Sequence, residues 1–308
     1  LDLLSRFQLK NEELLEVFDY CKAKGGLPLC TPWDLNSLNI LEDYGMNAYK
    51  VSSADLTNSE LLEALAKTGK PLICSTGMST EFEIKRAIQF FQDTQTPFIL
   101  LHCNSTYPTP YRDVNLRYMK RLKELSGNLV GYSGHERGFI TPVIAVGLGA
   151  KIIEKHFTID KDMEGNDHNV SLLPDEFADM VKQIRLTEEV LGDDRVRTIT
   201  QGESINREVM AKSLVTNQNI KKGNIITREM IEVKSPGQGL QPYLIDKLLG
   251  IKAKRDFLSG DYFFESDIMD SLSSARNYSF NRLFGIPARY HDYGSLISKT
   301  NVDFVEFH

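Results

Sequence analysis

Imidazole and carboxylate side chains crowd a short stretch of the sequence just after an apolar run. Residues 151–177 open as the buried-strand pattern KIIEKHF, end at a helix start, PDEF, and carry between them His156, Asp160, Asp162, Glu164, Asp167 and His168. Nitrogen and carboxylate ligands are usual partners of a catalytic divalent cation. We expect His135, His156 and Asp167 to surround one such cation, either Mn or Mg, and to leave coordination positions open. Open positions imply a Lewis acid rather than a structural metal.

A second chemical set consists of one lysine and several small hydroxyl side chains, each near the end of an apolar run. The set is Thr31, Lys50, Ser53, Ser75 and Ser133. Hydroxyls, backbone amides and one ammonium group, held in a fixed concavity, are what a phosphate needs. The set therefore predicts a phosphate-binding pocket.

Each of these side chains also has an ordinary explanation when it is taken alone. A single Ser or Thr after a strand is usually a helix cap, and a single His on a strand is usually a core residue. A charged loop such as residues 160–167 is usually solvated surface. All six apolar runs of the chain end in polar residues, and helix capping alone does not explain so consistent a pattern.

The elements that would position these residues alternate in type along the chain. Short apolar runs, typical of strands buried on both faces of a parallel sheet, occupy 26–33, 47–53, 70–78, 97–105, 128–135 and 150–157. Amphipathic helical patterns lie at 11–24, 34–44, 58–69, 79–93, 113–125, 139–149 and 174–192. Such βα repeats with short connections favour a (β/α)8 TIM barrel, whose active site lies at the carboxyl ends of its strands.

Six predicted strands are too few for an eight-stranded barrel. We expect the chain to begin inside the barrel, without the first strand, the first helix and the second strand, so that the barrel is truncated at its N-terminus. A six-stranded open sheet is the alternative.

Composition limits the function classes. The chain has 308 residues, 41% of them hydrophobic and 25% charged, and a net charge of −6. This balance argues against nucleic acid or an anionic membrane as the main partner, and no apolar run is long enough to span a bilayer. The four cysteines lack a C-x-x-C spacing, which predicts reduced thiols and a cytoplasmic protein.

A resemblance becomes specific when the words TPWD, AYKVSSAD, GKPLICSTGM, LLHCNSTYPTPYRDVNL, GYSGH and IIEKHFTIDKDMEGNDH are taken in order. From about residue 8 to residue 270 the chain resembles the sialic acid synthase family. These enzymes condense phosphoenolpyruvate with an N-acetylated hexosamine to make nonulosonic acids.

The resemblance implies a role for each matching residue. Phosphoenolpyruvate would be bound by Thr31, Lys50, Ser53, Ser75 and Ser133; the metal by His135 and His156; and the acceptor sugar by Asp55, Ser105, Tyr107, Asp167 and Ser235. Lys50, His135, His156 and Asp167 would be the catalytic residues. The family often has Glu at Asp55 and Arg at Ser235. These departures favour a differently decorated acceptor, such as a 2,4-diacetamido-trideoxyhexose, over plain N-acetylmannosamine.

The chemistry also suits the residues themselves. A cation would polarise the acceptor aldehyde, the enol carbon of phosphoenolpyruvate would attack it, and water would add at C2 before phosphate leaves by C–O cleavage. Three alternatives stay open: a synthase that acts on a 6-phosphorylated hexosamine, a metal-dependent barrel hydrolase, and a non-catalytic module in which the barrel is a scaffold.

The rest of the chain differs from the barrel pattern. The barrel is expected over 1–192, a charged linker over 193–208 and a small β-rich domain over 209–270, which resembles the antifreeze-like domain of the family. In relatives that domain caps the partner's barrel, which implies a domain-swapped homodimer. Residues 271–308 are expected to form a linker and the start of a second βα barrel, resembling sugar isomerases.

Overall fold

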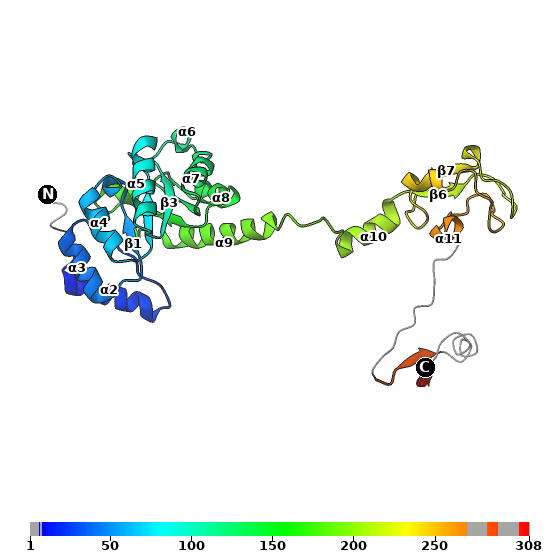
Figure 1. The fold of residues 1–308 in the computed structure, drawn as a ribbon, viewed down its shortest axis with the longest axis horizontal. Helices are drawn as coiled ribbons and strands as arrows, with labels where there is room; N and C mark the ends of the chain where they lie inside the picture. The colour runs from blue at the N-terminus through cyan, green and yellow to red at the C-terminus, as the bar shows by residue number, and fades with distance from the viewer. Residues whose placement is uncertain (1–5, 7, 270–281, 289–301, 308) are drawn as a thin grey trace. The chain divides into compact units, whose positions relative to one another are not determined.

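The computed structural model describes residue 6 and residues 8–269, 282–288 and 302–307 (Figure 1). The chain divides into two compact units, Leu1–Asp194 and Arg195–His308. Each unit is described by itself below.

The first unit is built on a parallel sheet of five strands (Figure 1). They are β1 Tyr49–Val51, β2 Leu72–Ser75, β3 Phe98–Cys103, β4 Val130–Gly134 and β5 Ile153–Lys155. The strands neighbour one another in chain order, so each crossover steps to the next strand in the same direction. This order gives a curled sheet, a half-barrel, rather than an open sheet that is wound in two directions.

Helices connect the strands and cover the apolar face of the sheet. They are α2 Asn11–Ala23, α3 Leu35–Tyr44, α4 Ser59–Lys67, α5 Glu81–Asp93, α6 Tyr111–Val114, α7 Tyr118–Ser126, α8 Ile140–Gly147 and α9 Pro174–Leu191. Local signals set several starts: the Asp34 side chain accepts from the Ser37 amide at 2.7 Å, and Thr80 and Glu83 form a capping box. The core between helices and sheet is apolar, with Tyr49, Leu72 and Leu100 fully buried.

Two predicted elements of this unit differ from the structure. The predicted strand at 26–33 is reduced to one bridge, between Cys30 and Tyr49, because Pro28 and Pro32 on either side have no amide hydrogen for a longer ladder. The predicted helix at 113–125 is interrupted at Asn115, whose φ of 49° is left-handed and separates α6 from α7.

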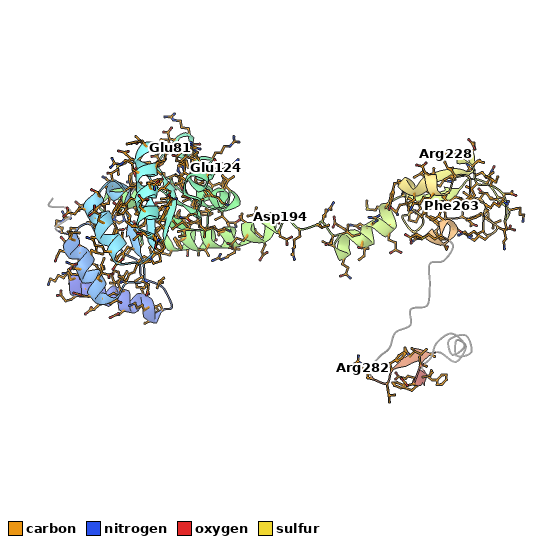
Figure 2. All side chains as sticks on the ribbon, viewed as in Figure 1. Glu81, Glu124, Asp194, Arg228, Phe263 and Arg282 are labelled. Atoms are coloured by element: carbon orange, nitrogen blue, oxygen red, sulfur yellow. The ribbon has the colours of Figure 1, made fainter. Side chains whose placement is uncertain are left out.

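The second unit contains a small β-rich fold. It has α10 Gln201–Met210, β6 Ser213–Thr216, β7 Ile231–Lys234 and α11 Glu265–Ile268, with short 3-10 turns at Arg228–Met230 and Pro242–Lys247. The first unit also has two such turns, Ser53–Asp55 and Asn166–Asn169. Strands β6 and β7 are antiparallel, and the core around them includes Leu214, Phe257 and Phe263, the last labelled in Figure 2. The second half of the predicted linker is helical, because Thr200 and Glu203 form a capping box at the start of α10.

Two further strands, β8 Gly285–Ala288 and β9 Phe304–Phe307, pair in parallel. Parallel pairing is what the start of a βα repeat requires. The predicted helix between them and the predicted linker at 271–279 lie outside the described residues, and the likeness to a second barrel stays a prediction. Within the described part of the chain, no helix has both the length and the apolar character needed to cross a bilayer.

Candidate active site

One cavity at the carboxyl edge of the sheet gathers most of the predicted site. Its volume is about 580 Å³. Its lining includes ten of the twelve predicted residues: Thr31, Lys50, Ser53, Ser75, Ser105, Tyr107, Ser133, His135, His156 and Asp167. The curled sheet brings these side chains together because parallel strands all end at the same edge.

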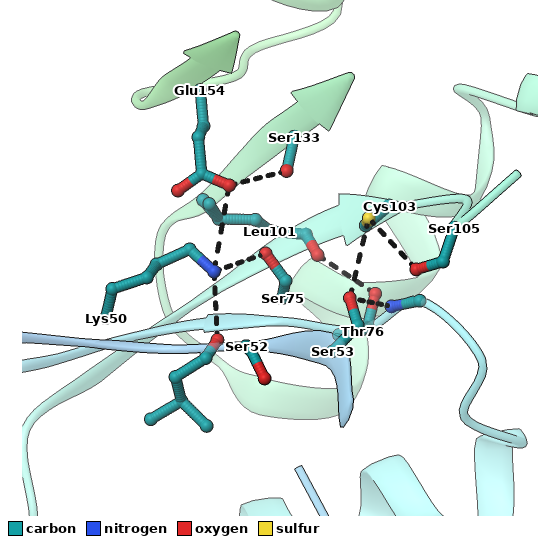
Figure 3. A network of polar contacts seen from close by, with 12 residues as sticks. Lys50, Ser52, Ser53, Ser75, Thr76, Leu101, Cys103, Ser105, Ser133 and Glu154 are labelled. Carbon is teal, nitrogen blue, oxygen red and sulfur yellow. Dashed lines mark hydrogen bonds and ion pairs between the residues drawn. The ribbon is translucent and has the colours of Figure 1, made fainter. Parts of the chain in front are cut away.

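Lys50 is the cation of one wall (Figure 3). Its Nζ donates to Ser75 Oγ at 2.8 Å and to the Val51 carbonyl at 2.9 Å, and lies 3.7 Å from Glu154 Oε1. Its position follows from strand alternation: Tyr49 and Val51 on either side are buried in the apolar core, so Lys50 faces the other way.

Glu154 joins Lys50 to the next hydroxyl of this wall. Ser133 Oγ donates to Glu154 Oε1 at 2.7 Å, and the two residues are direct partners in the β4–β5 register (Figure 3). Glu154 lies in the predicted strand at 150–157, and the sequence pattern alone assigns it no role. The signal that identifies it is alternation, because Glu154 and His156 are two residues apart at the end of β5 and so face the same side.

Close backbone packing forms the floor beside Ser53. The Gly77 amide donates to Ser53 Oγ at 3.1 Å, and the Thr76 hydroxyl fixes the same loop by donating to the Leu101 carbonyl at 2.9 Å. A Cβ at Gly77 would lie 2.8 Å from Ser53 Oγ and 2.2 Å from Ser105 Oγ. Only glycine therefore leaves room for both hydroxyls in their present positions.

The imidazole wall is formed by His135 and His156. Their ring centroids are 5.1 Å apart, with an angle of 63° between the ring planes. His135 Nδ1 lies 2.7 Å from the Asn104 carbonyl, so in the neutral ring Nδ1 donates and Nε2 accepts from the Tyr107 hydroxyl at 2.9 Å. Asp167 Oδ2 lies 3.7 Å from His156 Nδ1.

The surroundings shift the pKa values of the two histidines in opposite directions. Burial lowers the pKa of His156, and the nearby Asp167 carboxylate opposes this only in part. Burial acts in the same sense on His135, but contacts to Cys103 Sγ and the Asn104 carbonyl outweigh it and raise the pKa of His135. The neutral imidazole favoured at His156 is the form that binds metals.

The donor chemistry of this wall fits a divalent cation. Two imidazoles and one carboxylate are a common open ligand set. Over the part of the chain that the structure describes, no three His, Cys, Asp or Glu side chains already lie close enough to hold an ion. His135, His156 and Asp167 are the residues that would hold it.

Two predicted site residues lie elsewhere. The buried Asp55 carboxylate accepts from Ser52 Oγ at 2.7 Å and from Asn58 Nδ2 at 3.2 Å, which stabilises the turn before α4, and Asp55 is not among the lining residues described above. Ser235 belongs to the second unit, where Lys212 Nζ donates to its hydroxyl at 2.8 Å.

Comparison with known proteins finds relatives that include synthases of pseudaminic and legionaminic acids. It is 41% identical over 269 residues to an uncharacterised protein of Methanocaldococcus jannaschii, with 87% of this chain and 80% of that protein covered. It is 37% identical over 253 residues to the pseudaminic acid synthase of Campylobacter jejuni, with 82% and 73% covered. It is 35% identical over 260 residues to the N,N'-diacetyllegionaminic acid synthase of the same species, with 83% and 78% covered.

A solved structure and two family models agree with these relatives. The crystal structure of an N-acetylneuraminic acid synthetase from Leptospira borgpetersenii, in complex with citrate, matches with a TM-score of 0.61 and 36% identity, covering 65% of this chain and 70% of that one. Residues 211–269 match the SAF domain, the antifreeze-like module expected from the sequence. Residues 1–196 match the NeuB family model, and the chain belongs to the NeuB family.

Proposed function

We propose that the protein condenses phosphoenolpyruvate with an N-acetylated hexosamine and releases phosphate by C–O cleavage. The observation that carries the proposal is one cavity with two chemically different walls: Lys50 and hydroxyls on one, and His135, His156 and Asp167 on the other. A hydrolase would need only the imidazole wall and would leave Lys50 and Ser75 without a task. The relatives named as synthases support the same choice.

The phosphate of phosphoenolpyruvate would lie against Lys50, Ser75 and Ser133. Lys50 supplies positive charge, and the hydroxyls of Thr31, Ser53 and Ser75 supply directed donors. Ser133 would donate to the phosphate once its hydroxyl turns away from Glu154 Oε1. Ser75 already accepts a hydrogen bond from Lys50, so its hydroxyl hydrogen is free to point toward a phosphate oxygen. These groups would hold the phosphate in place and stabilise the charge that grows on it as the C–O bond breaks.

The acceptor aldehyde would lie near His135, His156 and Asp167. A divalent cation, Mn or Mg, bound there would supply Lewis-acid polarisation of the aldehyde. C3 of phosphoenolpyruvate would form the new C–C bond at the aldehyde carbon, water would add at C2, and phosphate would leave with the electron pair of the C–O bond. Tyr107, whose hydroxyl lies 2.9 Å from His135 Nε2, and Ser105, which also lines the cavity, would orient the acceptor.

The acceptor we favour is a 2,4-diacetamido-trideoxyhexose. One relative is named for a product with two N-acetyl groups, and another is a pseudaminic acid synthase. Ser235, which stands where the family often has Arg, also argues against plain N-acetylmannosamine. We also propose that the half-barrel is part of a (β/α)8 barrel, and that the enzyme is cytoplasmic and acts as a domain-swapped homodimer.

An isotope experiment tests the reaction. Phosphoenolpyruvate labelled with ¹⁸O at the bridging oxygen is mixed with the protein, Mn²⁺ and one sugar at a time: a 2,4-diacetamido-trideoxyhexose, N-acetylmannosamine or its 6-phosphate. C–O cleavage transfers the label to phosphate, which mass spectrometry detects. Sugar-dependent labelled phosphate is the expected result. Phosphate without label, or release that does not depend on a sugar, would contradict the proposal. In a parallel arm, Ser235→Arg should change the preference among sugars and leave phosphoenolpyruvate affinity unchanged.

A further inference from the structure

Behind the imidazole wall lies a buried polar cluster, here called the carboxyl-edge triad, made of Tyr132, Glu136 and Lys155. The side chains of Glu136 and Lys155 are 0% exposed. Lys155 Nζ donates to the Glu136 backbone carbonyl and lies 3.2 Å from Glu136 Oε1, and the Tyr132 hydroxyl donates to Glu136 Oε2 at 2.6 Å. The cavity chemistry proposed above uses none of the three.

The position of this triad relative to the histidines is specific. Glu136 follows His135 directly, and Lys155 directly precedes His156. Because side chains alternate along a strand, the Lys155 side chain leaves β5 on the side opposite Glu154 and His156, although Lys155 also contributes to the lining of the cavity. Lys155 is also the register partner of Gly134, the residue before His135. The ion pair therefore joins the ends of β4 and β5 at the positions next to both imidazoles.

Stability alone does not explain a buried ion pair. Removing two charges from water is costly, and apolar side chains of similar volume are often as stable or more so. The backbone is also fitted to this carboxylate: a Cβ at Gly134 would lie 2.6 Å from Glu136 Oε2 and 2.7 Å from Tyr132 Cε1. What charged, hydrogen-bonded groups add over apolar ones is a fixed geometry, because hydrogen bonds are directional and apolar contacts are not.

We infer that Tyr132, Glu136 and Lys155 are positioning residues that fix His135 and His156 relative to each other. Lys155 holds both the carboxylate and the carbonyl of residue 136, so a shift of either strand end would break two contacts at once. The purpose of this arrangement rests on the proposed function, in which both imidazoles act on one acceptor. The geometry itself can be tested without any substrate.

The decisive variant replaces the whole triad by apolar side chains of similar size, Tyr132→Phe/Glu136→Met/Lys155→Met. With no charge left unpaired, its melting temperature should stay close to that of the wild type. The readout is NMR of the full chain with ¹³C-labelled histidine, in which the six imidazoles are assigned by His→Gln variants. We expect the NOE cross-peak between the rings of His135 and His156 to weaken, because the rings move relative to each other, and the resonances of both rings to shift. Phosphate release should fall about tenfold or more, with the KM for phosphoenolpyruvate unchanged.

A matched control exists in the same unit. Glu42, Tyr49 and Lys70, here called the amino-edge triad, have the same three residue types, with the Tyr49 hydroxyl and Lys70 Nζ both bonded to Glu42 Oε1. Tyr49→Phe/Glu42→Met/Lys70→Met should leave the resonances of His135 and His156 unchanged.

Single variants separate positioning from folding. Lys155→Met alone leaves a buried carboxylate without its cation and should lower the melting temperature by about 10 °C. Lys155→Arg keeps a cation at this position, so its histidine resonances should lie at the wild-type positions. A folded apolar triple variant with wild-type ring resonances and turnover would overturn the inference. If the triple variant does not fold, Tyr132→Phe decides, because it removes only a hydroxyl: a shift of the His135 resonance supports positioning, and no shift overturns it. Absence of phosphate release by the wild type would refute the proposed reaction and leave the NMR result valid.

Discussion

The two edges of one parallel sheet carry the same three residue types in different surroundings. The carboxyl-edge triad is closed to solvent, with Lys155 and Glu136 side chains 0% exposed. In the amino-edge triad, Tyr49 is the first residue of β1 and Lys70 precedes β2, and the side chains of Lys70 and Glu42 are 26% and 33% exposed. Water partly solvates the charged groups of the amino-edge triad, whereas protein atoms alone stabilise the charged groups of the carboxyl-edge triad.

The difference matches the division of labour in βα barrels, in which the carboxyl edge carries chemistry and the amino edge carries stability. The partly exposed pair of Lys70 and Glu42 resembles an ordinary surface ion pair, which contributes little and tolerates change. The buried pair of Glu136 and Lys155 lies beside two histidines and has little freedom to rearrange. We expect substitutions at the carboxyl edge to change turnover, and substitutions at the amino edge to change only stability.

The largest effect is expected from His156→Ala. Loss of one of the two imidazoles should abolish phosphoenolpyruvate-dependent phosphate release, since a divalent cation would lose a main ligand. The melting temperature should change little, because the His156 side chain is 30% exposed and packs only in part. Phosphate release and thermal unfolding are measured side by side. A preparation stripped of metal by a chelator that keeps full turnover would refute the Lewis-acid role.

A smaller effect is expected from Lys50→Ala. A charge-assisted contact contributes about 1.5–3 kcal/mol, so the affinity for phosphoenolpyruvate should fall about tenfold or more. The affinity for the sugar should change less, because Lys50 lies on the hydroxyl wall with Ser75. Calorimetric titration with each substrate separates the two, and Lys70→Ala at the amino edge is the control. Equal losses for both substrates would contradict the two-wall arrangement.

At the amino edge, Lys70→Met should lower the melting temperature by only about 2 °C. A partly exposed ion pair contributes about 0–1 kcal/mol, and Tyr49 still donates to Glu42 after the change. The kcat and KM for both substrates should match those of the wild type. If turnover falls, the amino edge takes part in the chemistry and the comparison fails.

The smallest effect is a pH dependence of unfolding. Burial opposes ionisation of Glu42, but hydrogen bonds from Lys70 and Tyr49 outweigh it and hold the pKa of Glu42 below its usual value of 4.5. A lowered folded pKa contributes stability that is present above pH 4.5 and is lost as the pH falls through the folded value. Urea unfolding between pH 6 and about pH 2 should therefore show a flatter decline for Glu42→Gln than for the wild type. With Tyr49→Phe, the decline should be smaller and should end at a higher pH, because one of the lowering hydrogen bonds is gone and the folded pKa of Glu42 lies closer to 4.5.

Much of the curled sheet could be predicted from the sequence because its signals are local. Apolar runs that end in polar residues placed Lys50, Ser75 and Ser133 near strand ends, and the structure brings them into one cavity. The run at 26–33 was less informative, because its apolar content suggested a strand and its prolines limited it to a single bridge.

The contacts behind the site could not be predicted in the same way. Lys155 appears in the sequence as one charge among several, and nothing local shows that it pairs with Glu136, which lies 19 residues earlier in the chain. Asp55 illustrates the opposite problem. Its place after a strand suggests the cavity, but its carboxylate bonds to the side chains of Ser52 and Asn58, which is a local structural role in the turn before α4.

Gly77 has a consequence for anyone who redesigns this protein. The space above its Cα is already filled by the hydroxyls of Ser53 and Ser105, one of which is expected to face phosphoenolpyruvate and the other the sugar. Libraries that vary these positions one at a time would score residue 77 as intolerant and miss its partners. Gly77→Ala should become acceptable only when neither Ser53 nor Ser105 keeps its hydroxyl in place, because the new methyl group would lie 2.8 Å from Ser53 Oγ and 2.2 Å from Ser105 Oγ. Positions 53, 77 and 105 should therefore be varied together. A substitution at residue 105 that is chosen to change sugar specificity would also alter the packing of the loop after β2 against Ser53.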